Sequence, residues 1–304
     1  MTFKSGGDTC HAWFVRPEAP GGPRPCVVIG HGLGLTRRSG LMPIAERFAR
    51  AGYSALVFDY RGFGDSGGAP RQVISFRGQR EDWAAAVAFA RSRADVDSEA
   101  VVAWGFSLGA GHAVSITADD AAIAAVIAVA PMLSGLSATL AAMRWWSLWN
   151  TWRIFVQGVR DCFATLFRRQ PVCLPLSAPA GKLGLLTSPD AYPGYRAIVP
   201  DDFEFQSAAK IGLYFWSYSP GRRLKAIRAP TMVLPASLDK ICPPGPTRAR
   251  ARSSPNSEVY EIECEHMAAL TEPVLGEVLS ASVDFLARHV PPPSAEVEQP
   301  ERLR

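Results

Sequence analysis

Short apolar runs alternate with amphipathic stretches along the first part of the chain. The runs are rich in aliphatic and β-branched residues, and turn-forming or polar residues close them, which predicts buried strands. The stretches between them carry apolar residues at helical spacing. Predicted strands are residues 25–30, 53–59, 100–104 and 123–130, and predicted helices are residues 41–51, 77–93 and a helix that starts at Ser107. Apolar strands that alternate with helices predict an α/β fold, with a mostly parallel sheet covered on both faces.

This alternation stops at Met132 and resumes after Lys225. The intervening segment has clustered aromatic residues and several prolines, so we predict that residues 132–225 are a helical cap insertion and that residues 1–131 and 226–290 build the core. The resumed pattern predicts strands 231–235 and 258–262, a helix around Arg248 and a long amphipathic helix from about Met267 to His289. Residues 291–304 begin with three prolines and have little to bury, which predicts a disordered tail.

Composition adds constraints on partners and compartment. Hydrophobic residues make up 48% of the chain and charged residues 20%, which is typical of a globule with a substantial core. The net charge of +4 is spread along the chain, so we expect no nucleic-acid partner. The six cysteines lie far apart without CxxC spacing, which argues against a zinc site and favours a reduced, cytoplasmic compartment. No signal-like leader and no run of about 18 apolar residues is present, so we expect neither export nor stable membrane insertion.

A nucleophile motif stands at the end of one predicted strand. Gly105-Phe106-Ser107-Leu108-Gly109 has the G-x-S-x-G spacing, in which the serine occupies a tight turn between a strand and a helix. The flanking glycines let backbone segments approach closely. Because an apolar strand precedes the motif and a helix of small residues follows it, we predict that Ser107 is a nucleophile.

A serine hydroxyl needs a base, and the base needs a group that orients it. With this motif the acid and then the histidine follow the serine along the chain, each after a late strand. Asp239 follows predicted strand 231–235 and His266 follows strand 258–262, so we predict that they are the acid and the base. Other acids in this part of the chain are Asp201, Asp202 and Glu265, and the other histidines are His11, His31, His112 and His289.

Attack on a carbonyl creates an oxyanion that backbone amides must stabilise. The residue after the nucleophile, Leu108, supplies one amide. The second is expected from the loop His31-Gly32-Leu33-Gly34, which follows the strand at residues 25–30, and Leu33 is our candidate. We expect the His31 side chain to hold this loop.

Together these motifs resemble the α/β-hydrolase superfamily along nearly the whole chain outside the insertion. The resemblance rests on HGLG, on Asp59-Tyr60-Arg61-Gly62-Phe63-Gly64-Asp65-Ser66, on GFSLG, and on Asp239 and His266. It implies that Asp59 and Asp65 organise loops and are not catalytic. Within the superfamily the chain is similar to bacterial esterase and dipeptidyl-peptidase-like hydrolases and to polyketide acyl transferases.

The insertion carries many aromatic residues: Trp145, Trp146, Trp149, Trp152, Phe155, Phe163 and Phe167. Most are expected to pack within a small helical cap. A cap over the nucleophile implies an apolar pocket and a hydrophobic substrate, with Trp145 and Trp149 as candidate contacts. An amphipathic membrane-binding lid is the alternative, which the lack of a dense basic face disfavours.

Three hypotheses follow for function. The first is hydrolysis of a carboxylic ester, thioester or lactone of a hydrophobic small molecule through an acyl-enzyme on Ser107. The second is acyl transfer or cyclisation with the same triad in polyketide-like biosynthesis, with water excluded by the cap. The third, a non-catalytic ligand receptor, is disfavoured by the intact set of triad residues. No metal or organic cofactor is expected, because HExxH and P-loop motifs, and a GxGxxG motif that joins a strand directly to a helix, are missing from the sequence. A homodimer is kept open.

Overall fold

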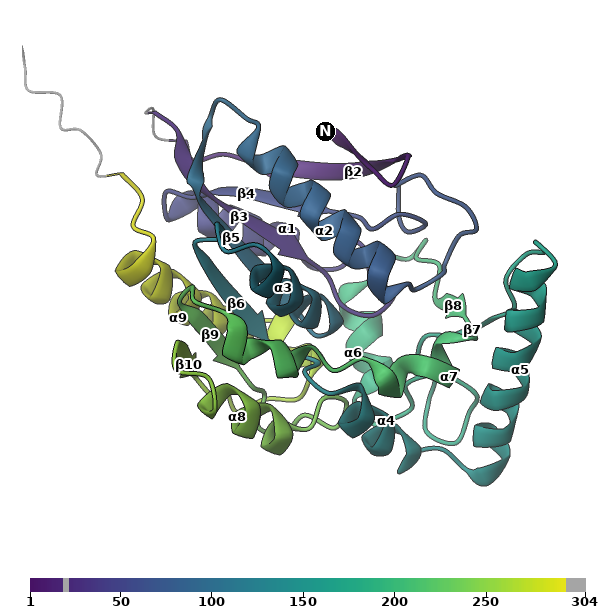
Figure 1. Cartoon of the computed structure of the whole chain (residues 1–304). Coiled ribbons are helices and arrows are strands. Elements are labelled where there is room, and N and C mark those ends of the chain that lie inside the picture. The colour runs from purple at the N-terminus through teal and green to yellow at the C-terminus, as the bar shows by residue number, and fades with distance from the viewer. Residues whose placement is uncertain (19–21, 294–304) are drawn as a thin grey trace, which may run out of the picture.

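The computed structural model describes residues 1–18 and 22–293 (Figure 1). Within this part of the chain, a central sheet lies between two layers of helices, and a mainly helical segment extends from one end of the sheet. The predicted tail at residues 291–304 lies outside the described residues from position 294 onward.

The central sheet has eight strands in the order β1-β2-β4-β3-β5-β6-β9-β10. Strands β1 and β2 form an antiparallel hairpin at one edge, β2 pairs antiparallel with β4, and the other pairs are parallel. The prediction of a mostly parallel sheet is therefore confirmed. The strands are Thr2–Ser5, Asp8–Val15, Arg24–Gly30, Ser54–Phe58, Val96–Phe106, Ala125–Val129, Thr231–Leu234 and Ser257–Val259 for β1 to β6, β9 and β10.

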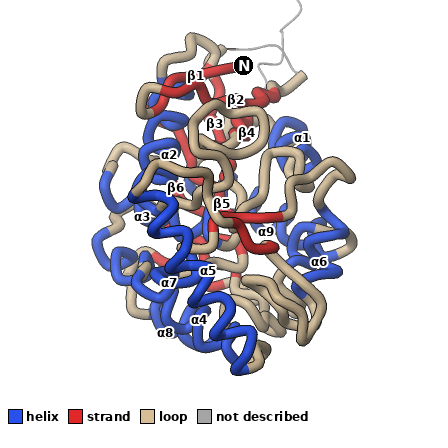
Figure 2. Tube along the Cα trace, turned by 90° about the vertical axis from the view of Figure 1, so that its right-hand side faces the viewer, coloured by secondary structure: helices blue, strands red, loops and turns tan. Residues whose placement is uncertain are grey.

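Helices cover both faces of this sheet. Helices α1 (Met42–Arg50) and α9 (Val274–His289) pack on one face, and α2 (Phe76–Arg91), α3 (Leu108–Asp119) and α8 (Pro244–Arg252) pack on the other, as Figure 2 shows for α1 to α3 and α9. Side chains of β5 alternate between the two layers, because successive residues of a strand point to opposite faces. Val102 and Trp104 join the α1 and α9 side, whereas Val101 and Ala103 join the α2 and α3 side.

The chain leaves the sheet after β6 and returns to it at β9. The intervening segment contains helices α4 (Gly135–Met143), α5 (Leu148–Leu166), α6 (Ala191–Ile198) and α7 (Ile211–Tyr214), with short 3₁₀ turns η1 (Phe215–Ser217) and η2 (Pro220–Ala226). It also contains a small antiparallel ribbon of β7 (Cys173–Pro175) and β8 (Gln206–Ala208), which the sequence analysis did not predict. Three-residue strands are too short to show a period in the sequence. We refer to residues 132–225 as the cap.

The predicted long helix from Met267 to His289 is wrong in its first part. A 3₁₀ turn, η3 (Met267–Leu270), is followed by a break, and α9 begins only at Val274. Pro273 explains the break, because proline lacks an N–H donor and disfavours helical backbone at the residue before it. No helix in the described ranges combines the length and the hydropathy that a membrane span requires.

Candidate active site

Ser107 occupies the turn between β5 and α3. Its backbone has φ of 55° and ψ of −119°, a conformation that residues other than glycine rarely adopt. This conformation presents the hydroxyl at the end of the sheet. The two flanking glycines are required by close backbone contacts. A Cβ on Gly105 would lie 2.5 Å from the Gly109 carbonyl oxygen, and a Cβ on Gly109 would lie 2.4 Å from the carbonyl oxygen of His31.

The structure brings the three predicted triad residues together. The Ser107 hydroxyl lies 2.9 Å from Nε2 of His266, and Nδ1 of His266 lies 2.6 Å from Oδ2 of Asp239. Because a carboxylate can only accept, Nδ1–H donates to Asp239, and Nε2 of the neutral ring is then free to accept from Ser107. All three side chains are buried. This arrangement can withdraw the proton from the serine hydroxyl as it attacks.

Asp239 is itself held by the loop that follows β9. Its second carboxylate oxygen accepts from the backbone N–H groups of Ile241 at 2.8 Å and Cys242 at 2.7 Å. These bonds fix the carboxylate so that its other oxygen faces His266.

The alternative histidines and acids lie elsewhere. His112 is enclosed between Gln79 and Tyr218, and burial lowers the pKa of its ring to about 3. His289 pairs with Glu258, Asp202 with Arg38, and Glu265 with Lys240; Asp201 is exposed, and His11 lies in β2. None of the hydrogen bonds and ion pairs named here involves Ser107 or His266.

The predicted oxyanion loop faces the nucleophile. Leu33 and Leu108 both line the cavity that contains Ser107, and Gly32 lies so close that a Cβ there would be 3.1 Å from Cβ of Ser107. The cap fastens this loop, because the Tyr195 hydroxyl of α6 donates to the Leu33 carbonyl at 2.9 Å. Leu108 is the first residue of α3, so its N–H has no partner within the helix.

The His31 side chain also holds this loop. Its Nδ1–H donates to the Gly32 carbonyl at 3.2 Å, and its own carbonyl accepts from the hydroxyl of Tyr60. Burial lowers the pKa of His31 to about 3, so the ring is neutral. This geometry agrees with a loop-holding role for His31.

Cys242 lies beside the triad and was not among the predicted site residues. It lines the same cavity as Ser107, and burial raises the pKa of its thiol well above the ordinary value, with the nearby Asp239 carboxylate adding to the effect. Cys242, Asp239 and His266 are also the one group in the described chain whose donor atoms are spaced as metal ligands are. Asp239 and His266 already use those atoms in the bonds described above. The signal in the sequence was only its position, three residues after Asp239.

A cavity of about 50 Å³ opens over Ser107, with room for a few water molecules. Its wall is apolar and comes largely from the cap, with Met132, Ala138, Leu185, Ile211 and Phe215 among its members. No charged side chain is among the described residues that line it. A long ligand would require movement of the cap.

The tryptophan that lines this cavity is not one of the two predicted as substrate contacts. Trp146 is in the cavity wall, whereas Trp145 and Trp149 are not, and the Trp149 side chain is 65% exposed. Two polar atoms of the wall residues lack partners among the described residues: Oγ1 of Thr139 and Nε1 of Trp146, both buried. They are the hydrogen-bonding side chains that the cap contributes to an otherwise apolar wall.

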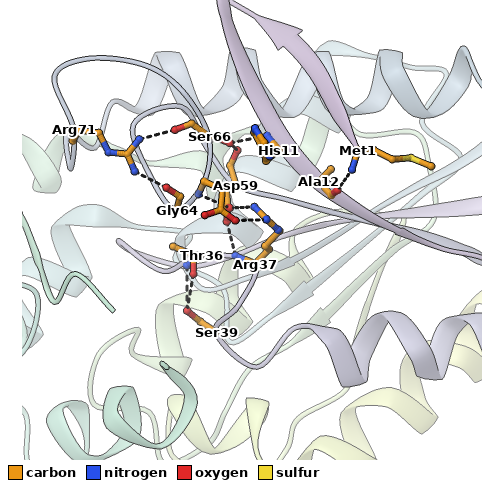
Figure 3. A network of polar contacts seen from close by, with 11 residues as sticks. Met1, His11, Ala12, Thr36, Arg37, Ser39, Asp59, Gly64, Ser66 and Arg71 are labelled. Carbon is orange, nitrogen blue, oxygen red and sulfur yellow. Dashed lines mark hydrogen bonds and ion pairs between the residues drawn. The ribbon is translucent and has the colours of Figure 1, made fainter. Parts of the chain in front are cut away.

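Asp59 organises the loops behind the site (Figure 3). Its carboxylate accepts from the backbone N–H of Arg37 at 2.6 Å and from that of Asp65 at 3.2 Å, and it pairs with the Arg37 guanidinium. Burial raises the pKa of Asp59, although Arg37 opposes the shift. The partners of Asp59 are therefore structural, as the family resemblance implied.

Comparison with known proteins identifies relatives along nearly the whole chain. The family model described as "Serine aminopeptidase, S33" matches residues 21–165. The quorum-quenching protein AidA of Acinetobacter baumannii (strain MDR-ZJ06) is 37% identical over 293 residues, covering 96% of this chain and 95% of the relative. The polyketide transferase grgF of Penicillium sp is 25% identical over 294 residues, covering 93% of this chain and 94% of the relative.

Solved structures show the same fold. The crystal structure of the α/β hydrolase GrgF from Penicillium sp. sh18 has a TM-score of 0.80 at 23% identity, covering 95% of this chain and 97% of that chain. DcsB, solved in complex with its substrate analogue, has a TM-score of 0.78 at 24% identity, covering 95% and 98%. At this level of identity the structures establish the fold alone.

Proposed function

Because the chain belongs to the α/β-hydrolase superfamily of serine hydrolases, we propose that Ser107, His266 and Asp239 are its catalytic triad. The proposed reaction is hydrolysis of a carboxylic ester, thioester or lactone that carries a hydrophobic group. The observation that carries the proposal is the continuous hydrogen-bonded chain from Ser107 through His266 to Asp239, at the floor of an apolar cavity.

Acylation begins when the Ser107 oxygen attacks the substrate carbonyl carbon. The hydroxyl proton moves to Nε2 of His266, and Asp239 stabilises the resulting imidazolium through Nδ1–H. The backbone N–H groups of Leu33 and Leu108 donate hydrogen bonds to the negatively charged carbonyl oxygen and so stabilise it. When the bond to the leaving oxygen or sulfur breaks, His266 returns the proton to the leaving group, and the acyl group remains on Ser107.

Deacylation repeats these steps with water as the nucleophile. His266 takes a proton from the water, the hydroxide attacks the acyl carbon, and the Ser107 oxygen leaves and regains the proton. The products are a carboxylic acid and free enzyme. For a lactone substrate, the alcohol and the acid stay in one opened molecule.

The cavity wall supports the choice of substrate class. Its apolar side chains favour a hydrocarbon group, at roughly 25 cal/mol for each Å² of apolar surface removed from water. No carboxylate among the described lining residues could bind an α-ammonium group, which favours esters, thioesters or lactones over peptides with a free amino terminus. Thr139 and Trp146 offer hydrogen bonds, so we infer that the hydrophobic group also carries an acceptor oxygen.

Relatives support two candidate reactions on the same triad. A quorum-quenching protein is the relative with 37% identity, which makes acylated lactone signals suitable test substrates. A polyketide transferase also aligns over nearly the whole chain, so acyl transfer to an alcohol or amine is the second candidate. A cap that closes over the acyl-enzyme would favour this second reaction, because it would exclude competing water.

The test is to capture the acyl group on the enzyme and follow its fate. Wild-type protein is mixed with p-nitrophenyl decanoate, quenched in acid and digested, and the acylated peptide is identified by mass spectrometry. We expect the acyl group on the peptide that contains Ser107. In water alone the product should be decanoic acid. If an added alcohol or amine accepts the acyl group, the product should be a decanoyl ester or amide. Acylation of another residue would contradict the proposal.

A panel of p-nitrophenyl esters from acetate to dodecanoate and of N-acyl homoserine lactones then defines the substrate. We expect kcat/KM to rise with chain length, by up to about 0.8 kcal/mol for each methylene, until the cavity is full. A steady fall from acetate upward would contradict the hydrophobic-substrate part of the proposal while leaving the triad intact.

A further inference from the structure

We propose that the outer face of α4 and α5 docks on a lipid bilayer that contains anionic phospholipid. This inference goes beyond the hydrolytic function and does not depend on it. It rests on the apolar side chains of this face, on its charge, and on its position relative to the cavity.

Helix α5 is apolar on the side that faces away from the protein. Most of its exposed large apolar side chains are separated by three, four or eight residues, spacings close to whole helical turns, so they form one stripe along the helix. Leu148 is 92% exposed and Leu166 is 71% exposed, and Trp152 and Phe155 between them stack with ring centroids 6.1 Å apart. The remaining exposed apolar side chains on or next to α5 are Trp149, Phe163 and Phe167.

The opposite side of α5 is packed against the rest of the cap. Ile154, Gly158 and Ala164 are buried, and a Cβ on Gly158 would lie 2.7 Å from the Leu213 side chain. The buried Asp161 carboxylate accepts from the backbone N–H groups of Val172 and Lys210, both at 3.0 Å. The helix is thus anchored with its outer apolar stripe in solvent. Figures 1 and 2 show α5 at the outer side of the cap, with α4 at its lower end.

Helix α4 extends this apolar face to the cavity. Leu136, Leu140 and Met143 are about half exposed and are spaced four and three residues apart, so they share one side of the helix. Ala138 and Ala142 of the same helix line the cavity over Ser107. A hydrophobic surface on one side of α4 is therefore separated from the cavity by the width of one helix.

The exposed charged residues beside this face are positively charged. Arg144, Arg153, Arg160, Arg168 and Arg169 are exposed, whereas Asp161 is the only acidic residue between Met132 and Pro189 and is buried. Arg153 and Arg160 follow the exposed stripe along one edge, since they lie one residue after Trp152 and Val159. From the sequence, a membrane-binding lid is disfavoured because a dense basic face is not evident, but the structure places separated arginines beside an apolar face.

These features together favour a bilayer over a second copy of the chain. Exposed tryptophan, phenylalanine and leucine with flanking arginine are typical of helices that lie in the interface of anionic membranes. A symmetric dimer through this face would bring like-charged arginines together without an exposed acid from the same segment to balance them. A bilayer also suits a substrate with a hydrophobic chain, which partitions into lipid.

The experiment is vesicle co-sedimentation with the full chain. Vesicles of phosphatidylcholine alone are compared with vesicles that also contain phosphatidylglycerol, at low and high salt. We expect binding to the phosphatidylglycerol vesicles that weakens with salt, and far weaker binding to phosphatidylcholine alone. Equal binding to both compositions, or binding to neither, would overturn the proposal.

Variants separate the apolar and the charged contributions. Arg153→Gln and Arg160→Gln should each weaken binding about fivefold, whereas Arg252→Gln on α8 removes the same charge away from this face and should leave binding unchanged. The double variant Trp152→Ser and Phe155→Ser should lose at least about tenfold, with Tyr260→Ser as the control for an exposed aromatic elsewhere.

Two further measurements control for misfolding of the variants and for dimerisation through this face. Hydrolysis of the water-soluble p-nitrophenyl acetate should be unchanged in every variant, which verifies the fold independently of lipid. Light scattering after size exclusion should give a monomer mass for wild type and variants. A dimer that dissociates in the Trp152→Ser, Phe155→Ser variant would mean that a second copy covers this face, and the proposal would be wrong.

Discussion

Gly109→Ala tests how closely the nucleophile turn and the oxyanion loop are coupled. A Cβ at this position would lie 2.4 Å from the His31 carbonyl oxygen and 2.6 Å from the Gly30 carbonyl oxygen. Both atoms belong to backbone, so they cannot move aside as a flexible side chain would. Ordinary contact begins at about 3.4 Å, and the loop or helix α3 must therefore shift by roughly 1 Å.

That shift separates Leu108, at the start of α3, from Leu33, in the loop that follows His31. Misplacing a reacting group by about 1 Å can cost on the order of 100-fold in rate, and losing one oxyanion donor costs a similar factor. We therefore expect kcat/KM to fall about 100-fold, or about 2.7 kcal/mol. The free energy of unfolding should fall by roughly 1–3 kcal/mol, as is typical of overpacking.

The assay is hydrolysis of p-nitrophenyl butanoate, together with urea unfolding to verify that the variant is folded. Gly245→Ala is the matched control, because a Cβ there meets no atom within 4 Å and the residue lies in helix α8. We expect the control to retain full activity, and its free energy of unfolding should stay within about 1 kcal/mol of wild type, because Pro246 offsets any gain from the added Cβ. A folded Gly109→Ala variant with activity within about threefold of wild type would refute the reasoning.

Three further predictions concern stability and specificity. Asp59→Asn leaves buried Arg37 without its carboxylate and should reduce the free energy of unfolding by about 3–5 kcal/mol, whereas Asp65→Asn, at a carboxylate that is 57% exposed, should cost under about 1 kcal/mol; equal costs would contradict a buried ion pair. His31 and His112 have pKa values lowered by burial to about 3 from 6.5, so below pH 6.5 the unfolded chain binds protons that the native ring does not. The contribution of these two rings to the free energy of unfolding is therefore complete above pH 6.5 and is lost toward pH 3. Between pH 7 and pH 5 the two rings together should lower the free energy of unfolding by about 4 kcal/mol. Urea titrations that give equal free energies of unfolding at pH 7 and pH 5 would contradict this prediction. Trp146→Phe keeps an aromatic ring, although a smaller one, and removes the N–H. The loss of kcat/KM should therefore be about two- to tenfold greater for a 3-oxodecanoyl ester than for the decanoyl ester, and an equal effect on both would reject the hydrogen bond.

The parts of the site that could be predicted from the sequence are those fixed by the order of strands. Ser107, Asp239 and His266 each follow a parallel strand, and the carboxyl ends of parallel strands meet at one edge of the sheet. Their approach could therefore be expected although His266 is 159 residues from Ser107. Strand β9 and the second half of β5 were predictable, because they are buried on both faces and read as continuous apolar runs, whereas β10 is short and partly exposed.

The cap could not be predicted at the same level. Helix α5 has apolar residues on its exposed side and at several buried positions. The spacing of apolar residues in the sequence therefore could not show which side of the helix packs against the protein and which side is exposed. This is why Trp149 was expected in the cavity, whereas Trp146, in the segment between α4 and α5, is the tryptophan that lines it. The pairing of Arg37 with Asp59 joins two loops that carry no shared sequence pattern, and only the fold brings them together.

The central claim is that Ser107 is the nucleophile, and labelling with a small fluorophosphonate tests it most directly. Wild type, Ser107→Ala and the control Ser253→Ala, at an exposed serine after helix α8, are incubated with the reagent, digested and analysed by mass spectrometry. We predict one label for each chain, on the peptide that contains Ser107, with labelling and ester turnover lost in Ser107→Ala and retained in Ser253→Ala. Label on a different serine, or turnover that survives in Ser107→Ala, would contradict the account.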